Sequence, residues 1–550
     1  MLETTVVVIG GGATGMGTLR DLSMRGVPAI LLEQGGIAHG TSSRFHGLLH
    51  SGARYVVNDP ESARECIEEN MILRRIGKQC VEITEGLFVL TARDDPDFVP
   101  KWQEGCKNAG IDAKEISVEE ALELEPNLAP DIKRCFRVPD SAVDGFRLVL
   151  HNRMSAQRYG GIVRHYHQVT GIKKKNGRVQ SVLVRDLMSG QEEEIRCRYV
   201  INAAGSWSGE VAALAGLEAS ITPDKGTLLA FNHRFCTRII NRLHPSSDGD
   251  IFVPHGTITI LGTTSIPTDK PDDTRPTYAE VLKLLDLGEP LFPLVKEYRI
   301  LRAFAGTRPL YTPGGASGRK ATRNFQVVDH AIEGVDGMVS IFGGKLTTYR
   351  LMAERVTDYV CGKLGVKIPC RTADEPLVET VDPDLLAKSA KVFPVHALNL
   401  MADRLGDELP DVLKHAQRMA EGEQKLTGVT LSDYLGNPLL CECELVSLAE
   451  IERVARDPST FSLKDIRLRT RLGMGTCQGA FCSVRTIGAL VEHNIALGFA
   501  PTDSVSRFMQ ERWKGARPAL WGQQAREMEF GRAIYAGLLN LDGAMHEQNN

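Results

Sequence analysis

Three glycines directly after a strand-forming run constrain the fold of this chain more than any other feature. Thr4–Ile9 is a β-branched, apolar run typical of a buried strand, and Gly10-x-Gly12-x-x-Gly15 follows it directly. Gly10 allows a tight turn, Gly12 lets the backbone approach a pyrophosphate, and Gly15 lets the next helix pack on the strand. The pattern predicts a strand, a turn and a helix at the start of an α/β nucleotide-binding sheet.

The residues after this turn complete a dinucleotide-binding unit. The helix is expected to run to about Arg25, and Ala29–Leu32 is typical of a second strand that leads to Glu33. A carboxylate at that point can accept both ribose hydroxyls of an adenosine. The motif by itself does not distinguish NAD from FAD.

Three later stretches favour FAD, although each alone could be an ordinary turn. Small hydroxyl side chains follow Glu33, a second strand-to-glycine crossing lies at 200–207, and residues 343–348 join a strand to a helix predicted over Leu346–Lys363. The N-terminus of such a helix would stabilise negative charge on a reduced flavin. The predicted cofactor contacts are Gly10, Gly12, Gly15, Glu33, Thr41, Ser42, Ser43, Val169, Ala204, Gly205, Trp207, Gly344, Leu346 and Thr347.

Composition limits the partners and the compartment. Lys and Arg number 65 against 69 for Asp and Glu, giving a net charge of −4, so the overall charge gives no reason to expect nucleic acid or an acidic membrane surface as partner. The N-terminus lacks a secretory signal pattern, and the apolar runs are shorter than a membrane-spanning helix requires. A cytoplasmic location with reduced thiols is therefore expected.

A length of 550 residues indicates about three structural units. The predicted fold class is α/β, with a Rossmann-like FAD-binding domain that contains an inserted antiparallel substrate domain. The alternation in Val163–Thr170, Arg178–Arg185 and Glu193–Val200 predicts an antiparallel meander. The expected limits are 1–365 for the oxidoreductase part, with the insert at about 85–150 and 225–320, then 366–437 for a helical connecting region, 438–495 for a small [2Fe–2S] domain and 496–550 for a C-terminal tail.

The 12 cysteines divide into eight scattered ones and four in two close pairs. Cys441-x-Cys443 and Cys477-x4-Cys482 supply four thiolates, which suit a [2Fe–2S] cluster or zinc. Structural zinc usually shows C-x-x-C pairs, so this spacing favours iron–sulfur over zinc and over free thiols. The pattern resembles the small [2Fe–2S] domain typified by bacterioferritin-associated ferredoxin. Cations before the second pair would stabilise a negatively charged cluster, unless they form an ordinary solvated helix face: Lys464, Arg467, Arg469 and Arg471.

Several motifs resemble those of the FAD-dependent glycerol-3-phosphate dehydrogenases. They appear in order as GGGATGMGTLRDLSMRG, GLLHSGARYVVNDPESARECIEEN, AGTRPL and FGGKLTTYRLMAE. The cysteine-bearing C-terminal part, with CECE, RTRLGMGTCQGAFC and ERWKG, resembles the large flavoprotein subunit of the anaerobic members. The resemblance covers nearly the whole chain and is weakest from about 380 to 435.

The resemblance implies an activity and a location. Members of this family oxidise sn-glycerol 3-phosphate to dihydroxyacetone phosphate, with FAD as cofactor, and pass the electrons through partner subunits to a membrane quinone. It implies that this chain is a cytoplasmic protein, held peripherally on the inner face of the membrane by its partners. It also supports a [2Fe–2S] cluster held by the four paired cysteines.

A dianionic substrate needs fixed cations, and its oxidation needs a base. The candidate cations are Arg54, Arg308, Arg323 and Lys345, and the resemblance implies that the last three lie in the phosphate pocket. Histidine is the usual base for a hydroxyl proton near neutral pH. His50, in the turn expected near the flavin, is the first candidate, ahead of His46.

Two other functions are compatible with parts of the sequence. A related FAD enzyme acting on a 2-hydroxy acid or an amino acid would share the glycine motif and Glu33 but would need fewer cations. A scaffold or redox sensor could also carry a flavin and a cluster. Such a protein would hold a flavin that no substrate reduces.

Overall fold

The fold was obtained as a computed structural model that describes residues 2–312, 324–379, 381–390, 393–427 and 438–541. Contacts between backbone positions divide the chain into two compact units. The first consists of Met1–His255, Thr259–Arg299 and Ala303–Leu377, and the second of Gly256–Ile258, Ile300–Arg302 and Val378–Asn550.

A mainly parallel sheet forms the centre of the first unit. Its strands follow the order β10-β3-β2-β14-β22-β21, in which only the pairing of β21 with β22 is antiparallel. The strand that begins the glycine motif, β2, is buried at every position, as its β-branched sequence predicts. The bounds are β2 Val6–Ile9, β3 Ala29–Glu33, β10 Ile162–His165, β14 Tyr199–Asn202, β21 Phe325–Asp329 and β22 Met338–Gly343.

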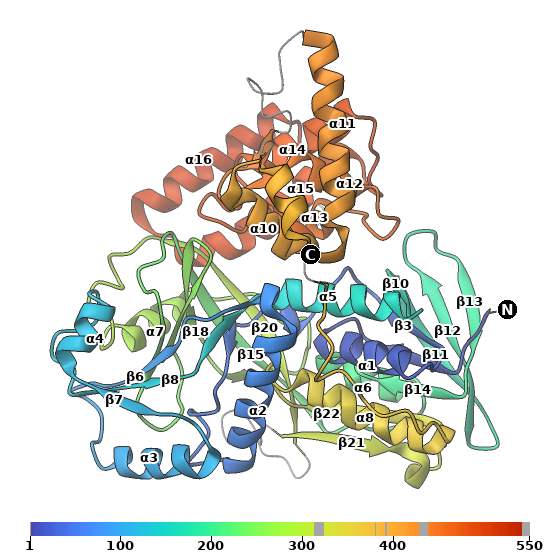
Figure 1. The fold of residues 1–550 in the computed structure, drawn as a ribbon, viewed down its shortest axis with the longest axis horizontal. Coiled ribbons are helices and arrows are strands. Elements are labelled where there is room, and N and C mark those ends of the chain that lie inside the picture. Colours follow the sequence, from blue (N-terminus) through green and yellow to red (C-terminus); the bar gives the residue numbers. More distant parts are fainter. Residues whose placement is uncertain (1, 313–323, 380, 391–392, 428–437, 542–550) are drawn as a thin grey trace. The chain divides into compact units, whose positions relative to one another are not determined.

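Helices cover one face of this sheet, and a second, mainly antiparallel sheet covers the other. On the helical face α1 (Ala13–Met24) packs against α5 (Gly145–Arg158) and α8 (Tyr349–Leu364), and it lies between them in Figure 1. On the other face Val7 and Ile30 share an apolar cluster with Val182 and Ile195 of the meander. The covering elements are β1 Leu2–Glu3, β11 His167–Lys175, β12 Arg178–Asp186, β13 Glu192–Arg196 and α6 Ser208–Ala213.

The meander exists, but two of its predicted strands were wrong. Residues 163–170 do not form one strand, because Tyr166 adopts a left-handed backbone (φ 59°) and divides them. The first part joins the parallel sheet as β10, and the second part, with Val169, begins β11. Residues 193–200 likewise divide at Cys197 into the end of β13 and the start of β14. Alternation of side chains persists across both breaks, so the pattern alone did not reveal them.

A large mixed sheet forms the rest of the first unit. Its order is β19-β15-β18-β17-β16-β6-β8-β7, with β20 beside β15. Most of its pairings are antiparallel, whereas β16 and β6 are parallel. The strands are β6 Gly86–Leu90, β7 Lys114–Ile116, β8 Arg134–Val138, β15 Ile221–Phe231, β16 Ile239–Arg242, β17 Ile251–His255, β18 Ile258–Gly262, β19 Ile266–Pro267 and β20 Ile300–Tyr311.

Helices and one short sheet complete this unit. The helices are α2 Pro60–Ile76, α3 Phe98–Ala109, α4 Val118–Leu124 and α7 Tyr278–Gly288. The short sheet consists of β4 Leu48–Leu49, β5 Val81–Glu82 and β9 Ser141–Val143. Because strands from 86–138 and from 221–311 join in one sheet, the chain leaves the parallel sheet for the mixed sheet twice and returns each time. The finer domain limits expected from the sequence stay predictions.

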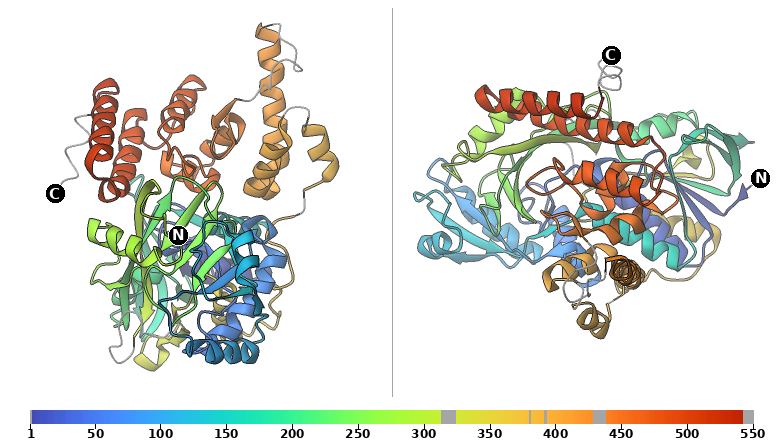
Figure 2. Two further views of the ribbon diagram at one scale, coloured as in Figure 1. Left: turned by 90° about the vertical axis from the view of Figure 1, so that its left-hand side faces the viewer. Right: turned by 90° about the horizontal axis from the view of Figure 1, so that it is seen from above.

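The second unit is helical, and Figure 2 shows its orange and red helices gathered together. Apolar clusters within it join α10 and α11 to α12, and α12 to α14 and α15. The described residues contain no helix long and apolar enough to cross a membrane. The elements are α9 Pro383–Ser389, α10 Val395–Leu405, α11 Leu409–Thr427, β23 Leu439–Cys441, β24 Val446–Ser447, α12 Leu448–Ala455, α13 Leu463–Thr470, α14 Cys482–Glu492, α15 Pro501–Ala516 and α16 Gly522–Leu538.

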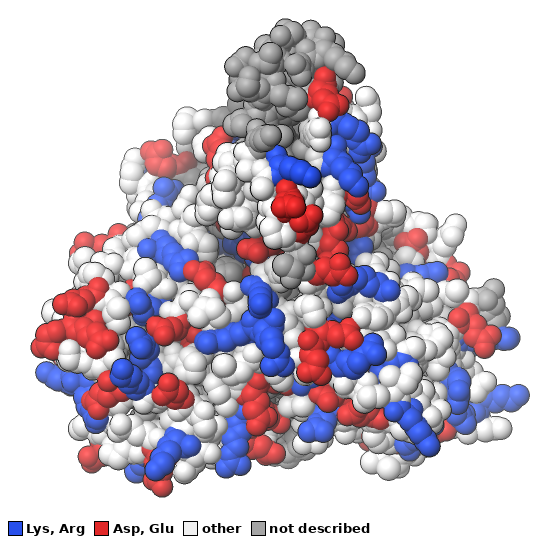
Figure 3. All heavy atoms as spheres, in the orientation of Figure 1, with Lys and Arg blue, Asp and Glu red and all other residues white. Residues whose placement is uncertain are grey.

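Charges of both signs are mixed on the face shown in Figure 3. Lys and Arg side chains lie among Asp and Glu side chains over both the helices and the sheets visible there. This distribution agrees with the nearly balanced composition of the chain.

Candidate active site

A cavity of about 740 Å³ opens at the carboxyl ends of the parallel strands. Residues that directly follow or end β2, β3, β14 and β22 line one side of it, and residues of the large mixed sheet line the other. Ligands of open α/β sheets bind at this edge. The volume falls in the range of small-molecule and cofactor pockets.

The glycine turn has the geometry that the sequence predicted. Gly10 has a φ of 111°, and an added Cβ would lie 2.6 Å from the carbonyl oxygen of Ala203. A Cβ on Gly15 would lie 1.9 Å from the carbonyl oxygen of Gly10, so only glycine lets α1 approach the turn. Gly12 lines the cavity and is the N-cap of α1 without a side-chain cap of its own. A helix start that borders a cavity in this way is typical of a pyrophosphate-binding site.

Glu33 holds the glycine turn from the neighbouring strand. Its carboxylate accepts hydrogen bonds from the N–H groups of Gly11 and Gly35, each at 2.7 Å, and the side chain is buried. A carboxylate offers about four acceptor sites, and acceptors of this kind are what ribose hydroxyls require. The residue thus fits a dinucleotide while also stabilising the turn.

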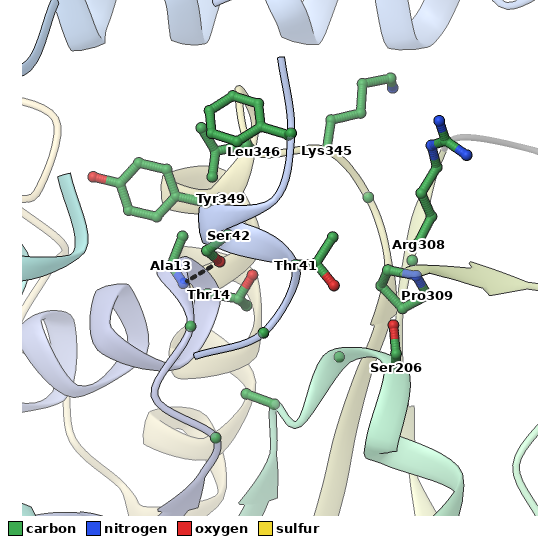
Figure 4. Close-up of a pocket in the computed structure, with 18 of the residues that line it drawn as sticks. Ala13, Thr14, Thr41, Ser42, Ser206, Arg308, Pro309, Lys345, Leu346 and Tyr349 are labelled. Carbon is green, nitrogen blue, oxygen red and sulfur yellow. Dashed lines mark hydrogen bonds between the residues drawn. The ribbon is translucent and has the colours of Figure 1, made fainter. Parts of the chain in front are cut away.

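The hydroxyl run after Glu33 lies across the same edge. Ser42 accepts a hydrogen bond at 2.9 Å from the N–H of Ala13 in the first turn of α1 (Figure 4). Thr41 donates to the carbonyl oxygen of Thr307 at 2.6 Å. Both line the cavity, whereas Ser43 is not among the lining residues and donates to Gly40 at 3.2 Å.

The remaining predicted cofactor residues meet in this cavity from distant parts of the chain. Gly344 and its neighbours arrive on the turn before α8, which begins at Tyr349 and not at Leu346 as the sequence suggested. The glycines at 343 and 344 have φ of 77° and 79°, and a turn occupies the next residues, which delays the helix. The lining residues predicted on these segments are Val169, Ala204, Gly205, Trp207, Gly344, Leu346 and Thr347.

Arg54 enters the cavity already paired with a buried carboxylate. Its Nη2 lies 2.7 Å from both oxygens of Asp250 and 2.9 Å from the carbonyl oxygen of Ser247. Burial raises the pKa of Asp250, but Arg54 and His244 outweigh burial and hold that pKa well below its ordinary range. Asp250 is consequently an anion that balances the charge of Arg54. The sequence did not predict this pairing, because the two residues are far apart in the chain and no motif includes Asp250.

Arg308 is balanced in the same way on another wall. Its guanidinium pairs with the buried Asp224, bonds to Thr263, and donates to the carbonyl oxygen of Thr264 at 3.0 Å. The guanidinium lies close to the backbone of Gly226, where an added Cβ would approach Nη2 to 2.4 Å. Arg308 and Lys345 extend toward the same side in Figure 4.

Lys345 contributes a third cation, and Arg323 lies outside the described residues. The Nζ of Lys345 is 4.8 Å from the centre of the Tyr55 ring, a cation–π distance. Tyr55 also lines the cavity and is adjacent in sequence to Arg54. Arg54, Arg308 and Lys345 therefore line the described cavity together with Asp250, while Asp224 pairs with Arg308 from behind the lining residues.

His50 lies buried beside these cations. Its ring centre is 5.7 Å from that of His46 and 5.3 Å from that of Tyr55. The backbone N–H of His50 donates to the hydroxyl of Thr347 at 3.2 Å. Burial first, and then His46, Arg54 and Lys345, hold the pKa of His50 well below its ordinary 6.5. The imidazole is accordingly neutral at pH 7 and able to accept a proton.

The four paired cysteines converge in the second unit. Among the described residues no group of three or more His, Cys, Asp or Glu side chains forms a ready metal site. The thiols are nevertheless neighbours, since interaction with the Cys482 thiol lowers the pKa of both Cys441 and Cys477, and Cys477 also interacts with Cys443. The segment before Cys477 also lies close to the first cysteine pair, because a Cβ added to Gly475 would be 2.5 Å from the Cβ of Cys443. A soft four-thiol donor set fits a [2Fe–2S] cluster or zinc.

Comparison with known proteins identifies the family. Residues 5–350 match the model of the family described as FAD dependent oxidoreductase. Over 545 residues the chain is 42% identical to one subunit of the anaerobic glycerol-3-phosphate dehydrogenase of Escherichia coli, covering 98% of this chain and 97% of that protein. The chain belongs to the FAD-dependent oxidoreductases and, among them, to the anaerobic glycerol-3-phosphate dehydrogenases.

Further relatives agree with this family. The corresponding protein of Haloferax volcanii, also named as a subunit of an anaerobic glycerol-3-phosphate dehydrogenase, is 42% identical over 552 residues, covering 98% of this chain and 91% of that protein. A solved glycerol-3-phosphate dehydrogenase from Bacillus halodurans, complexed with FAD, superposes with a TM-score of 0.65 at 21% identity and covers 98% of this chain and 94% of its own. At 21% identity, the match to the Bacillus halodurans structure supports the fold alone. The family resemblance inferred from the sequence is confirmed.

The contacts of Glu33 predict its effect on the affinity for FAD. Glu33→Gln replaces a carboxylate that accepts two buried N–H donors by an amide that can accept through only one atom. Because the glycine turn loses a charge-assisted hydrogen bond of about 1.5–3 kcal/mol and the predicted ribose contact loses its charge, we expect the affinity for FAD to fall about 10- to 100-fold. Flavin fluorescence on release, followed by equilibrium dialysis, measures the change.

The matched control is Glu192→Gln, which removes the same charge from an exposed surface pair with Arg185. It should leave the affinity for FAD unchanged. An affinity for FAD in Glu33→Gln equal to that of the control would contradict the assigned role of Glu33.

Proposed function

We propose that this protein oxidises sn-glycerol 3-phosphate to dihydroxyacetone phosphate in this cavity. The observation that carries the proposal is the convergence of His50, Arg54, Arg308 and Lys345 in one cavity with the dinucleotide-type glycine turn. The relatives support it, since they are named as anaerobic glycerol-3-phosphate dehydrogenase subunits and the match to this chain covers nearly their whole length. The roles of individual residues belong to the same proposal.

The cations select a phosphorylated substrate. The guanidinium groups of Arg54 and Arg308 and the ammonium of Lys345 offer N–H donors to the phosphate oxygens. Asp224 and Asp250 hold the two arginines in place and offset their charge, so the cavity tolerates several cations before the substrate arrives. A lone carboxylate substrate would need fewer of these groups, which favours a dianion. Arg323 is proposed as a further phosphate ligand on the strength of the family motif.

His50 is proposed as the base that removes the hydroxyl proton. Its neutral imidazole lies in the same cavity as the cations, and its backbone is fixed by Thr347 on the turn before α8. Two neighbouring cations disfavour protonation of the free ring, and the alkoxide that forms would be stabilised by the same charges. When bound, FAD supplies the acceptor for the hydride that leaves C2 of the substrate. His46 remains the second candidate for the base.

The cofactor residues are proposed to bind FAD along the carboxyl edge of the sheet. Gly10, Gly12 and Gly15 shape the pyrophosphate turn, and Glu33 accepts the ribose hydroxyls. The other predicted contacts follow the edge toward Lys345 and His50, where the reacting ring must lie. They are Thr41, Ser42, Ser43, Val169, Ala204, Gly205, Trp207, Gly344, Leu346 and Thr347.

The four cysteines are proposed to hold a [2Fe–2S] cluster that serves as the electron exit. Cys441, Cys443, Cys477 and Cys482 provide the thiols, and a bound cluster supplies one-electron transfer. Each relative is named as one subunit of its enzyme, which supports a complex with further redox proteins. We propose that these partners carry the electrons to a membrane quinone and hold the chain peripherally on the inner face of the membrane.

Replacement of His50 tests the assignment of the base. His50→Ala should lower kcat at least about 100-fold while FAD stays bound, because general-base catalysis typically contributes that much. In the wild type, kcat at saturating substrate should stay level as the pH falls through 6.5, because the low pKa keeps His50 neutral there. Steady-state assays with an artificial electron acceptor measure both quantities.

The control is His46→Ala, which removes an imidazole from the same cavity. Its effect on kcat should be the smaller of the two. A His50→Ala variant with near-normal kcat, or one no worse than His46→Ala, would remove His50 from this role.

A comparison of substrates tests the proposed activity itself. The purified flavoprotein should reduce an artificial acceptor with sn-glycerol 3-phosphate and show little turnover with 2-hydroxyglutarate or an amino acid. Lys345→Met should raise KM for the phosphorylated substrate about tenfold, since one charged hydrogen bond of about 1.5 kcal/mol is lost. Turnover with the carboxylate substrates and none with glycerol 3-phosphate would refute the assignment, and a flavin that none of them reduces would favour a non-enzymatic role.

A further inference from the structure

None of the described residues of the region 366–437 lines the cavity, yet one side chain from this region reaches the loop of the first cysteine pair. Arg404, on α10, is 2% exposed. Its Nη1 donates to the carbonyl oxygen of Glu444, and its Nη2 donates to that of Leu445, each at 3.0 Å. These two carbonyls directly follow Cys443 in the chain. A residue of the helical region thus binds the backbone of the cysteine loop.

The guanidinium is itself held by a carboxylate at the start of the next helix. Glu450 is fully buried and accepts from Nε and Nη2 of Arg404 at 3.0 and 2.7 Å. The same carboxylate accepts from the N–H of Ser447 at 2.8 Å and completes the capping box of α12. Arg404, Glu450 and the loop therefore form one buried network between α10 and α12.

The loop needs such support because its backbone is strained. Leu445 adopts a left-handed conformation with φ of 51°, which is uncommon for a residue with a branched side chain. Conformations of this kind persist where the surroundings fix them. On the other side Glu444 pairs with the buried Arg471, at 2.8 Å, and Arg471 lies shortly before Cys477. Two arginines thus clamp the loop, one from the helical region and one from the segment of the second cysteine pair.

We propose that Arg404 is a positioning residue that sets the geometry of the Cys441–Cys443 loop for the [2Fe–2S] cluster. The helical region before the cysteines then supports the cysteine loop and belongs structurally to the same cluster-binding unit. The inference rests on the proposed function of the four cysteines as cluster ligands. It adds a residue that no cysteine spacing or basic run in the sequence indicated.

The test compares full-length Arg404→Ala and Arg404→Lys with the wild type under anaerobic conditions. Iron and acid-labile sulfide are measured per FAD, cluster loss is followed in the presence of an iron chelator, and the reduced proteins are examined by EPR. Residues that support metal ligands typically change metal affinity about 10- to 100-fold. Cluster loss should accelerate about tenfold in Arg404→Ala, and its EPR g-values should shift. Arg404→Lys should lie between, because lysine keeps the charge but cannot reach both carbonyls and Glu450 together.

Arg453→Ala is the matched control. Arg453 on α12 pairs at 3.5 Å with Glu408, which follows α10, so this change removes a link between the same two segments without a bond to the cysteine loop. Its cluster lifetime and EPR spectrum should equal those of the wild type. Reduction of the flavin by glycerol 3-phosphate should be unchanged in every variant, which shows that the first unit is intact.

The outcomes separate the two proposals. A wild-type cluster together with wild-type behaviour of Arg404→Ala, or equal effects of Arg404→Ala and Arg453→Ala, would overturn the inference alone. Wild-type protein that binds FAD but carries zinc, or no iron and sulfide, would overturn the cluster proposal and the inference with it. If Arg404→Ala does not fold, a wild-type EPR spectrum and cluster lifetime in Arg404→Lys would likewise overturn the inference.

Discussion

The close approach of α1 to the turn after β2 is the constraint on which the rest of the site depends. No side chain larger than hydrogen fits at Gly15, because the carbonyl oxygen of Gly10 occupies the place of a Cβ. The same crossing brings Ala203, the residue directly after β14, against Gly10. Once this contact forms, the ends of β2, β3, β14 and β22 meet at one edge. The glycine turn, Glu33, the 41–43 loop and the turn carrying Lys345 all reach the cavity from that edge.

Charge balance is the second condition for this site. A cavity that gathers three cations around a buried histidine would be strongly unfavourable without nearby anions. Asp250 balances Arg54 and Asp224 balances Arg308, each through a direct and largely buried contact. These carboxylates keep the arginines fixed without filling the cavity. The site is consequently preorganised for an anion while its own net charge stays moderate.

Features encoded in a local pattern were predictable from the sequence, whereas contacts between residues far apart in the chain were not. The glycine motif, both flanking strands and Glu33 were predictable because each carries a physical requirement of its own at a fixed spacing. The breaks at Tyr166 and Cys197 were not, because alternation continues through them. The partners Asp224 and Asp250 come from remote strands and loops, and no spacing in the sequence relates them to their arginines.

The cysteine pairs show the same contrast in the second unit. Their spacing indicated one metal-binding body, and the thiols do lie together. Arg404 could not be found that way, because it belongs to a segment without any motif and acts through backbone carbonyls. The contribution of such a residue is visible only when the loop that it holds is seen folded.

The central claim is that one chain joins substrate oxidation to a one-electron exit. Anaerobic titration of the purified protein with glycerol 3-phosphate, followed by flavin absorbance and by EPR on the same samples, tests it most directly. We predict that the oxidised flavin absorbance falls and that the EPR signal of a reduced [2Fe–2S] cluster appears, with no other reductant added. A flavin that stays oxidised, or one that is reduced while no cluster signal develops, would contradict this claim.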